Sequence, residues 1–161
     1  MEWYTGTNQH VTFDDITDIV ASHYAVGGTI YVGTDSHVQQ KKCVFSTSIC
    51  LLGNINGVNN RYFFTRHKDN SKKYSTLLQR ITVEVQKSID IGLKLLEFCP
   101  KIDIELHLDI SPENKNETTS VYSKMLVGYA RGNGFDCKIK PNAFAASSVA
   151  DRHSKVNKKK K

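Results

Sequence analysis

Three strand-like runs that follow one another closely constrain the fold more than any other feature. They are Thr29–Asp35, Lys42–Leu52 and Arg61–His67, with a Gly-Asn-Ile-Asn-Gly turn at residues 53–57 between the second and third. β-Branched and aromatic residues favour strands, whereas glycine and asparagine favour turns. Strands joined by such short connections pair in antiparallel fashion, because a parallel pair needs a longer crossover. The pattern therefore predicts a three-stranded antiparallel meander.

Helical periodicity precedes this meander and follows it. Apolar residues of Ser75–Phe98 recur at helical spacing, and Pro100 ends the pattern. A shorter helix is expected at Phe13–His23, where Thr12 and Asp15 resemble a capping box. The remaining expected elements are a strand at Ile102–Ile110, a helix at Thr118–Arg131, a strand at Phe135–Lys140 and a helix at Ala143–Lys155 capped by Asn142.

This order of elements predicts an α/β protein with a five-stranded mixed sheet and helices on both faces. The length of 161 residues suits one domain, which we expect to span residues 1–156 and to include the short N-terminal helix. A basic, disordered tail is expected at residues 157–161. Its lysines are open to two interpretations, a nucleic-acid-binding arm or a solubilising tail.

Charge and cysteine content narrow the class of partner. The net charge is +6 and the isoelectric point is about 9.1, which favours a polyanionic partner such as nucleic acid. None of the four cysteines belongs to a Cys-x-x-Cys pair, so we expect neither a zinc finger nor a disulfide. No apolar run reaches the ~20 residues of a membrane span, and the N-terminus lacks a signal-peptide pattern. We therefore expect a cytoplasmic protein that does not bind membranes.

Three aspartates lie where the expected elements can bring them together. Asp35 ends the first strand, Asp109 lies at the end of the fourth, and Asp151 belongs to the last helix. Carboxylate oxygens are the ligands that hard divalent cations prefer, so these positions predict a Mg²⁺ or Mn²⁺ site. Each aspartate also has a simpler interpretation: a turn residue, a polar strand face, or a surface carboxylate paired with Lys155.

Several sequence blocks carry a resemblance to a known family. They are Tyr31-Val-Gly-Thr-Asp35-Ser-His37, His107-Leu-Asp109-Ile, Gly134-Phe with Lys140-Pro141, and Ala145-Ala-Ser-Ser-Val-Ala-Asp151-Arg. In these blocks the chain resembles the YkuK-like family of predicted ribonuclease H-like proteins, from about Phe13 to about His153. The resemblance implies a ribonuclease H-like fold with acidic residues at the places of Asp35, Asp109 and Asp151. It also implies a glutamate on the helix after the meander, for which Glu84 is the candidate.

Other polar residues are candidates for supporting roles around this site. Three histidines are expected to hydrogen-bond near the metal ligands: His37, His107 and His153. Five basic residues are expected to contact nucleic-acid phosphates: Lys72, Lys73, Arg80, Lys140 and Arg152.

The sequence thus predicts a divalent-metal-dependent nuclease that hydrolyses phosphodiester bonds with two ions. Asp35 would bridge the ions, Asp109 and Asp151 would each hold one, and Glu84 would complete a site. Two alternatives stay open, a non-catalytic nucleic-acid-binding module on the same scaffold and a regulatory protein-interaction domain. RNA, DNA and hybrid substrates are all compatible with the sequence, as is any oligomeric state.

Overall fold

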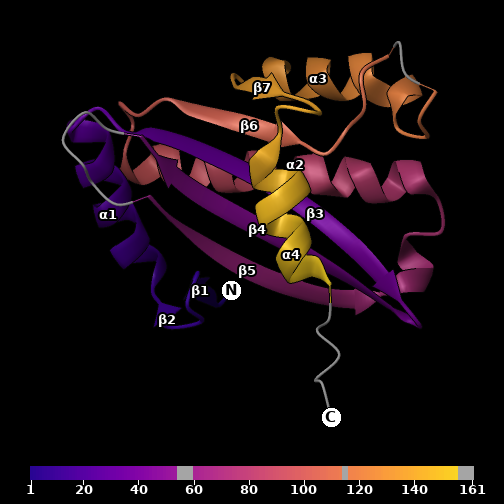
Figure 1. Cartoon of the computed structure of the whole chain (residues 1–161), viewed down its shortest axis with the longest axis horizontal. Helices are drawn as coiled ribbons and strands as arrows, with labels where there is room; N and C mark the ends of the chain where they lie inside the picture. Colours follow the sequence, from indigo (N-terminus) through magenta and orange to yellow (C-terminus); the bar gives the residue numbers. More distant parts are fainter. Residues whose placement is uncertain (54–59, 114–115, 156–161) are drawn as a thin grey trace.

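One sheet of seven strands organises the residues that the computed structural model describes, 1–53, 60–113 and 116–155. The strand order is β2-β1-β5-β4-β3-β6-β7, with parallel pairing from β3 through β6 to β7 and antiparallel pairing elsewhere (Figure 1). The sheet is therefore mixed as predicted, but the predicted number of five strands is wrong. The strands are β1 (Trp3–Thr5), β2 (His10–Val11), β3 (Thr29–Gln39), β4 (Lys42–Leu52), β5 (Arg61–Asn70), β6 (Ile104–Leu108) and β7 (Asp136–Lys138).

The three long strands β3, β4 and β5 form the predicted antiparallel meander. β4 has the predicted bounds, whereas β3 continues past Asp35 to Gln39 and β5 continues past His67 to Asn70. The extensions are polar, so the apolar pattern did not reveal them. They form because β4 pairs with both neighbours as far as Lys42, which supplies backbone hydrogen bonds whatever the side chains are.

The two extra strands lie at the N-terminus. β1 pairs with β5 through Trp3↔Thr65 and Thr5↔Phe63, and β2 pairs only with β1. Strands of three and two residues are too short to show alternation in a sequence. Trp3 is only 2% exposed, so burial of its large ring explains why this segment joins the sheet.

Helices α1 (Phe13–Ala25) and α2 (Leu77–Phe98) begin with capping boxes, the first of them the predicted one formed by Thr12 and Asp15. Their buried residues join those of the sheet in one hydrophobic core. A short 3₁₀ segment, η1 (Ser71–Lys73), precedes α2, which begins at Leu77 and not at the predicted Ser75.

The crossover elements are shorter than predicted. The predicted helix Thr118–Arg131 is a 3₁₀ turn, η2 (Ser120–Tyr122), followed by α3 (Ser123–Gly132). β6 and β7 are also shorter than their predicted ranges, because β6 pairs with β3 only over Ile104–Leu108 and β7 pairs with β6 over three residues.

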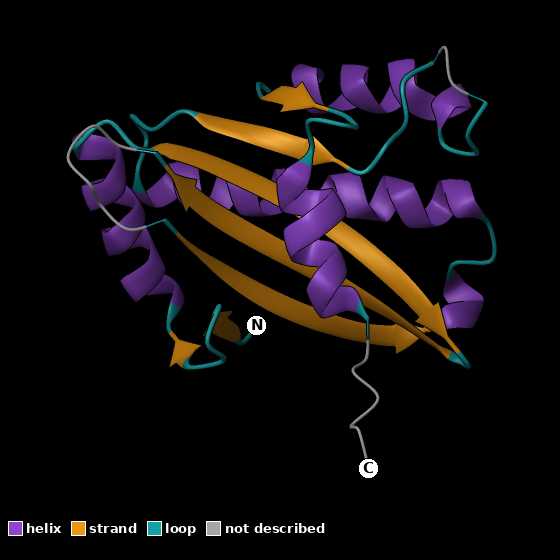
Figure 2. Cartoon of the chain, in the orientation of Figure 1, coloured by secondary structure: helices purple, strands orange, loops and turns teal. Residues whose placement is uncertain are grey.

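The C-terminal segment crosses the face of the sheet opposite α2 (Figures 1 and 2). It consists of a π-helix, η3 (Ala145–Ala150), that passes directly into α4 (Asp151–Ser154). A helix therefore lies close to the predicted range Ala143–Lys155, but most of it is a π-helix and the predicted cap by Asn142 is wrong. Tertiary hydrogen bonds hold the backbone of Ala145 instead: Ser48 Oγ donates to its carbonyl at 2.7 Å, and its N–H donates to His107 Nδ1 at 3.1 Å.

No helix within the described ranges is long and apolar enough to cross a membrane. The predicted tail at residues 157–161 and most of the predicted turn at residues 53–57 fall outside the described residues.

Candidate metal and nucleic-acid site

The first two candidate carboxylates lie at the same end of two neighbouring parallel strands. The ladder between β3 and β6 ends at the pair Thr34↔Leu108, and Asp35 and Asp109 are the next residues on each chain segment. The sequence predicted that Asp35 ends its strand. That prediction is wrong, because β3 continues beyond Asp35 with β4 as its partner. The parallel register therefore brings together two carboxylates that are far apart in sequence.

Asp151, the third candidate, arrives on the helix that crosses this face. Gly33 allows the crossing to be close, because a Cβ at that position would lie 2.4 Å from the backbone nitrogen of Ala146. One helical turn after Asp151, Ser154 Oγ donates a hydrogen bond to Asp35 Oδ2 at 2.7 Å. The first residue of α4, Asp151, is thereby fixed beside β3.

Glu84 approaches from the other layer. It lies on α2, is only 6% exposed, and accepts a hydrogen bond from Ser36 Oγ at 2.5 Å. Ser36 follows Asp35 on β3, and its side chain points to the opposite face by strand alternation. Glu84, the candidate that the family resemblance implied on the helix after the meander, is therefore buried and in contact with the central strand β3.

The carboxylates influence one another electrostatically. The pKa of Asp35 is raised to about 6, mainly by burial and less by the charges of Asp109 and Asp151, while the Ser154 hydrogen bond acts in the opposite direction. The pKa of Glu84 is raised well above its usual value by burial and then by the charge of Asp35, with Asp109 also contributing. These four acidic groups therefore form one coupled set.

Two lysines are paired with this acidic set. Lys140 Nζ lies 3.0 Å from Asp109 Oδ1, and Lys155 Nζ lies 2.7 Å from Asp151 Oδ2. The hydrogen bond to Asp151 is the main cause that raises the pKa of Lys155, and the charges of Asp35 and Asp109 add to it. Two of the acidic residues, Asp109 and Asp151, are thus each paired with a lysine ammonium group.

Within the described residues no three His, Cys, Asp or Glu side chains are placed to hold a metal ion, so the case for a divalent cation here rests on the chemistry of the carboxylate oxygens. Asp109 Oδ1 is buried, and its only ion-pair partner among the described residues is the ammonium of Lys140 at 3.0 Å. Mutually repelling carboxylates are stabilised by a cation, whether an ammonium or a hard metal ion. Asp35, Asp109 and Asp151 supply the oxygens that Mg²⁺ and Mn²⁺ prefer.

The three candidate histidines lie in different surroundings. His107 is buried and accepts from Ala145 N at Nδ1, so its proton lies on Nε2, which faces Glu105 at 3.2 Å. Burial lowers the pKa of His107 and lowers that of His153 to about 4, so both imidazoles are neutral near pH 7. His37 is half-buried on β3 and makes no side-chain hydrogen bond to the described residues.

The five predicted basic residues are not gathered in one place. Lys72 and Lys73 lie on η1 and Arg80 on the first turn of α2, and Lys73 is paired with Asp69 at 2.9 Å. Lys140 is paired with Asp109, and Arg152 is exposed on α4. Of these, Lys140 is paired with an acid of the set, the charge of Arg80 lowers the pKa of Glu84, and Arg152 follows Asp151 in the sequence.

Sequence reasoning did not identify Ser154 and Ser36, the hydroxyl donors to Asp35 and Glu84. Ser36 is adjacent to Asp35, and Ser154 lies one helical turn after Asp151, so both positions carried a weak signal. Serine is too common on surfaces for that signal to stand out without the tertiary contacts.

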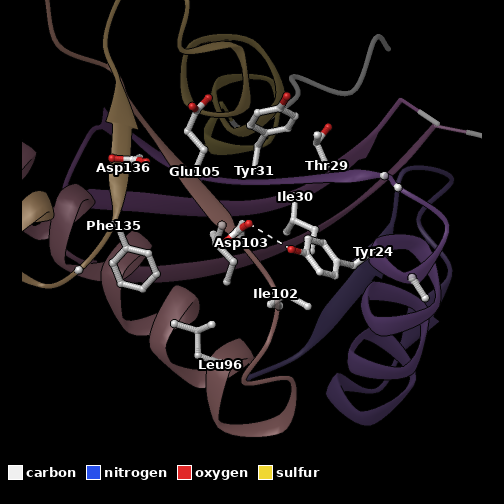
Figure 3. A pocket seen from close by; sticks show the side chains of 15 residues that line it. Tyr24, Thr29, Ile30, Tyr31, Leu96, Ile102, Asp103, Glu105, Phe135 and Asp136 are labelled. Carbon is white, nitrogen blue, oxygen red and sulfur yellow. Dashed lines mark hydrogen bonds between the residues drawn. The ribbon is translucent and has the colours of Figure 1, made fainter. Parts of the chain in front are cut away.

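A cavity of about 740 Å³ lies at the other end of the strands (Figure 3). Its wall includes Tyr24, whose hydroxyl donates to Asp103 at 3.1 Å, and Phe135. None of the four acidic residues described above lines it. We therefore place the functional site at the acidic set, where buried charges interact, and not at this cavity.

Comparison with known families agrees with this architecture. The family model described as ribonuclease H-like matches residues 11–155, so the chain belongs to the ribonuclease H-like family. No curated protein matches the chain.

Proposed function

We propose that this protein is a divalent-metal-dependent nuclease that hydrolyses phosphodiester bonds of nucleic acid. The observation that carries the proposal is that the parallel pairing of β3 with β6 brings Asp35 and Asp109 to the same end of the sheet, where Ser154, one helical turn after Asp151, donates a hydrogen bond to Asp35. Arrangements of this kind cost stability, and they are common where function requires the charges. Membership of the ribonuclease H-like family and the net charge of +6 support a nucleic-acid substrate.

Each acidic residue has a distinct part in the proposed mechanism. Asp35, which Ser154 holds in place, would supply carboxylate oxygens to two Mg²⁺ or Mn²⁺ ions together with Asp109 and Asp151. When bound, such ions supply Lewis-acid stabilisation of the phosphate and a water of lowered pKa. Glu84 retains its proton more strongly than an ordinary glutamate, and Ser36 orients its carboxyl group through Oε1. Glu84 thus adds oxygen atoms to the site with less added negative charge.

Lys140 and Lys155 have a role of their own in the proposed function. Their ammonium groups neutralise Asp109 and Asp151 before metal binds, which limits repulsion within the folded protein. Lys140 and Lys155 would also lie close enough to the site to contact a phosphate of the polyanionic substrate. Arg152, exposed beside Asp151, would contribute in the same direction.

A non-catalytic nucleic-acid-binding function is the second candidate. The observation that favours it is that lysines already occupy carboxylates of the set, while no ready metal cage is found in the described ranges. In that case the acidic set would serve only to position basic side chains. Our proposal also retains the narrower YkuK-like resemblance, one domain over residues 1–156 with a basic tail at 157–161, and a cytoplasmic location.

The test is a cleavage assay on labelled single- and double-stranded RNA and DNA, an RNA–DNA hybrid and a four-way junction. Each is incubated with Mg²⁺, Mn²⁺ or EDTA and the wild-type protein, with Asp35→Asn purified in parallel. Asp136→Asn is the matched control, because Asp136 is exposed on β7 and is not in the acidic set. We expect metal-dependent cleavage that Asp35→Asn abolishes and Asp136→Asn retains. Equal activity of Asp35→Asn and wild type would refute the assignment, and binding without cleavage of any substrate would favour the second candidate.

A further inference from the structure

Arg66 on β5 lies in line with Asp35 across the sheet. Asp35 pairs with Ser46 on β4, and Ser46 pairs with Arg66 on β5. Directly paired residues place their side chains on the same face, and strands lie about 4.8 Å apart, so the two backbones are separated by roughly 10 Å. His37 and Lys68 occupy the ends of the next row along the same face, through Val44. Two cationic residues, Arg66 and Lys68, thus flank the acidic set on its β5 side.

The guanidinium of Arg66 is held in place by the C-terminal helix and the sheet together. Its Cζ lies 5.1 Å from the centre of the Phe64 ring, and its Nη2 donates to His153 Nδ1 at 3.3 Å. His153 stacks on Phe64 at 3.6 Å between ring centres. Because Arg66 can only donate, Nδ1 of His153 accepts, and Nε2 then donates to the Tyr62 hydroxyl at 3.2 Å. Arg66 is therefore oriented before any ligand binds.

The same guanidinium remains free for a ligand. Arg66 and Lys68 are exposed, and among the described residues no carboxylate lies within ion-pair distance of either. They border a cavity of about 400 Å³ whose wall also includes Phe64, Tyr4 and Glu2, and the Glu2 carboxylate accepts a hydrogen bond from the Tyr4 hydroxyl at 2.8 Å. By contrast, three lysines are paired with aspartates: Lys73, Lys140 and Lys155. An unpaired, oriented arginine beside an open cavity is well suited to bind a phosphate.

We propose that Arg66 and Lys68 bind a backbone phosphate of the nucleic acid. A second phosphate lies over Asp35, and the phosphate bound by Arg66 and Lys68 lies next to it on the β5 side. The nucleic-acid chain then crosses the sheet from the acidic set toward β5 and β1. The position over Asp35 rests on the proposed nuclease function, whereas phosphate binding by Arg66 does not. Arg66 is a positioning residue in this assignment, because it contacts the strand away from the reacting bond. Neither residue was among the basic residues that the sequence predicted.

The experiment measures binding of a fluorescein-labelled single-stranded oligonucleotide, in RNA and DNA form, by anisotropy in EDTA over a range of salt concentrations. Arg66→Met and Lys68→Met keep side-chain length and remove the charge. Lys101→Met is the matched control, since Lys101 is exposed at the opposite end of the strands, before β6. Each lost phosphate contact on a single strand should lower the slope of log K against log salt by about 0.7. We expect that decrease for each β5 variant and none for Lys101→Met, with Arg66→Lys close to wild type.

A second arm locates the phosphate by replacing single phosphates of the oligonucleotide with neutral methylphosphonates in turn. Wild type should lose affinity at one position, and Arg66→Met should be insensitive at that same position. Unchanged salt slopes in both β5 variants, or equal sensitivity of Arg66→Met and wild type at every position, would overturn the proposal. If Arg66→Met does not fold, Lys68→Met decides, because the Lys68 side chain is exposed and makes no hydrogen bond or ion pair with a described residue. If the variants lower the salt slope but the wild-type protein cleaves no substrate, the phosphate subsite at Arg66 and Lys68 is supported and the proposed nuclease function is refuted.

Discussion

The hydroxyl of Ser154 donates to Oδ2 of Asp35 at 2.7 Å and joins the end of the last helix to a strand 119 residues earlier. The contact is completely buried on the Ser154 side, where the residue is 0% exposed. It stabilises the ionised form of a carboxyl group that burial disfavours. This one hydrogen bond therefore affects both the position of α4 and the charge of the candidate metal ligand.

Replacing Ser154 should change the pH at which Asp35 ionises. The Ser154→Ala variant loses the hydrogen bond that lowers the pKa of Asp35, so that pKa should move further above about 6, by roughly 0.5–1 unit. We expect the pH dependence of Mn²⁺ binding, measured by calorimetry, to move upward by a similar amount. Ser148→Ala, at an exposed position of η3, is the control. A Ser154→Ala profile that overlays wild type would contradict this prediction.

Asp35→Asn should stabilise the metal-free protein at neutral pH. The pKa of an aspartate is ordinarily 3.8, whereas that of Asp35 in the folded protein is about 6, so the folded state binds the proton more tightly. The contribution of Asp35 to stability is therefore fully present below about pH 4 and is lost as pH rises through about 6. Asn cannot ionise, so at about pH 8 the variant should have a free energy of unfolding about 1–3 kcal/mol higher than wild type. Urea denaturation at about pH 4 and about pH 8 tests this; a difference that persists at the lower pH would point to another cause.

Mn²⁺ should raise the melting temperature of wild type and not that of Asp109→Asn. Ligand that binds only the folded state stabilises it by mass action, by about 2.7 kcal/mol at a hundredfold excess over Kd. Asp109 supplies a buried oxygen, and the amide of Asn is a weaker ligand for hard cations. Glu105→Gln, on β6 and paired with Lys138, is the control and should respond like wild type. Equal shifts for Asp109→Asn and wild type would exclude Asp109 as a ligand.

Removing the ammonium of Lys155 should strengthen metal binding. Lys155 Nζ lies 2.7 Å from Asp151 Oδ2 and interacts with Asp35 and Asp109 as well, so it competes with a cation for the same carboxylates. We expect Lys155→Met to lower the Kd for Mn²⁺ by about two- to fivefold, a modest factor because the pair is partly exposed. Lys138→Met, which removes a comparable exposed lysine paired with Glu105, should leave the Kd unchanged. Weaker binding in Lys155→Met would show that the lysine supports the site instead.

Gly33→Ala should displace the C-terminal segment from the sheet. A Cβ at Gly33 would lie 2.4 Å from Ala146 N and 2.7 Å from Ala145 C, both of them backbone atoms that cannot rotate away. We expect a loss of about 2 kcal/mol or more in unfolding free energy, together with loss of Mn²⁺ binding. Gly128→Ala is the matched substitution, since its Cβ meets nothing within 4 Å on helix α3, and should stabilise by about 0.5–1 kcal/mol. Full metal binding by Gly33→Ala would show that α4 need not lie so close.

Much of the central architecture could be predicted because it follows local rules. The bounds of β4, the capping box of α1 and the long helix α2 follow from alternation, cap chemistry and helical spacing. The elements that were missed or wrongly predicted are those whose stability comes from a distant partner. β1 and β2 are too short to show a pattern, and η3 departs from α-helical geometry where Ser48 and His107 hold Ala145.

The candidate site divides in the same way. The sequence by itself determined the presence of carboxylates after two apolar runs and on a small-residue helix, because strand and helix patterns fix where such residues fall along the chain. Helical spacing also offered the pairing of Lys155 with Asp151, four residues apart. Only the tertiary structure decided that Ser154 reaches Asp35, that Lys140 pairs with Asp109, and that Arg66 faces the site unpaired. Those contacts join residues that no local periodicity relates, and they exist because strand register and the close crossing at Gly33 bring separate segments within hydrogen-bond distance.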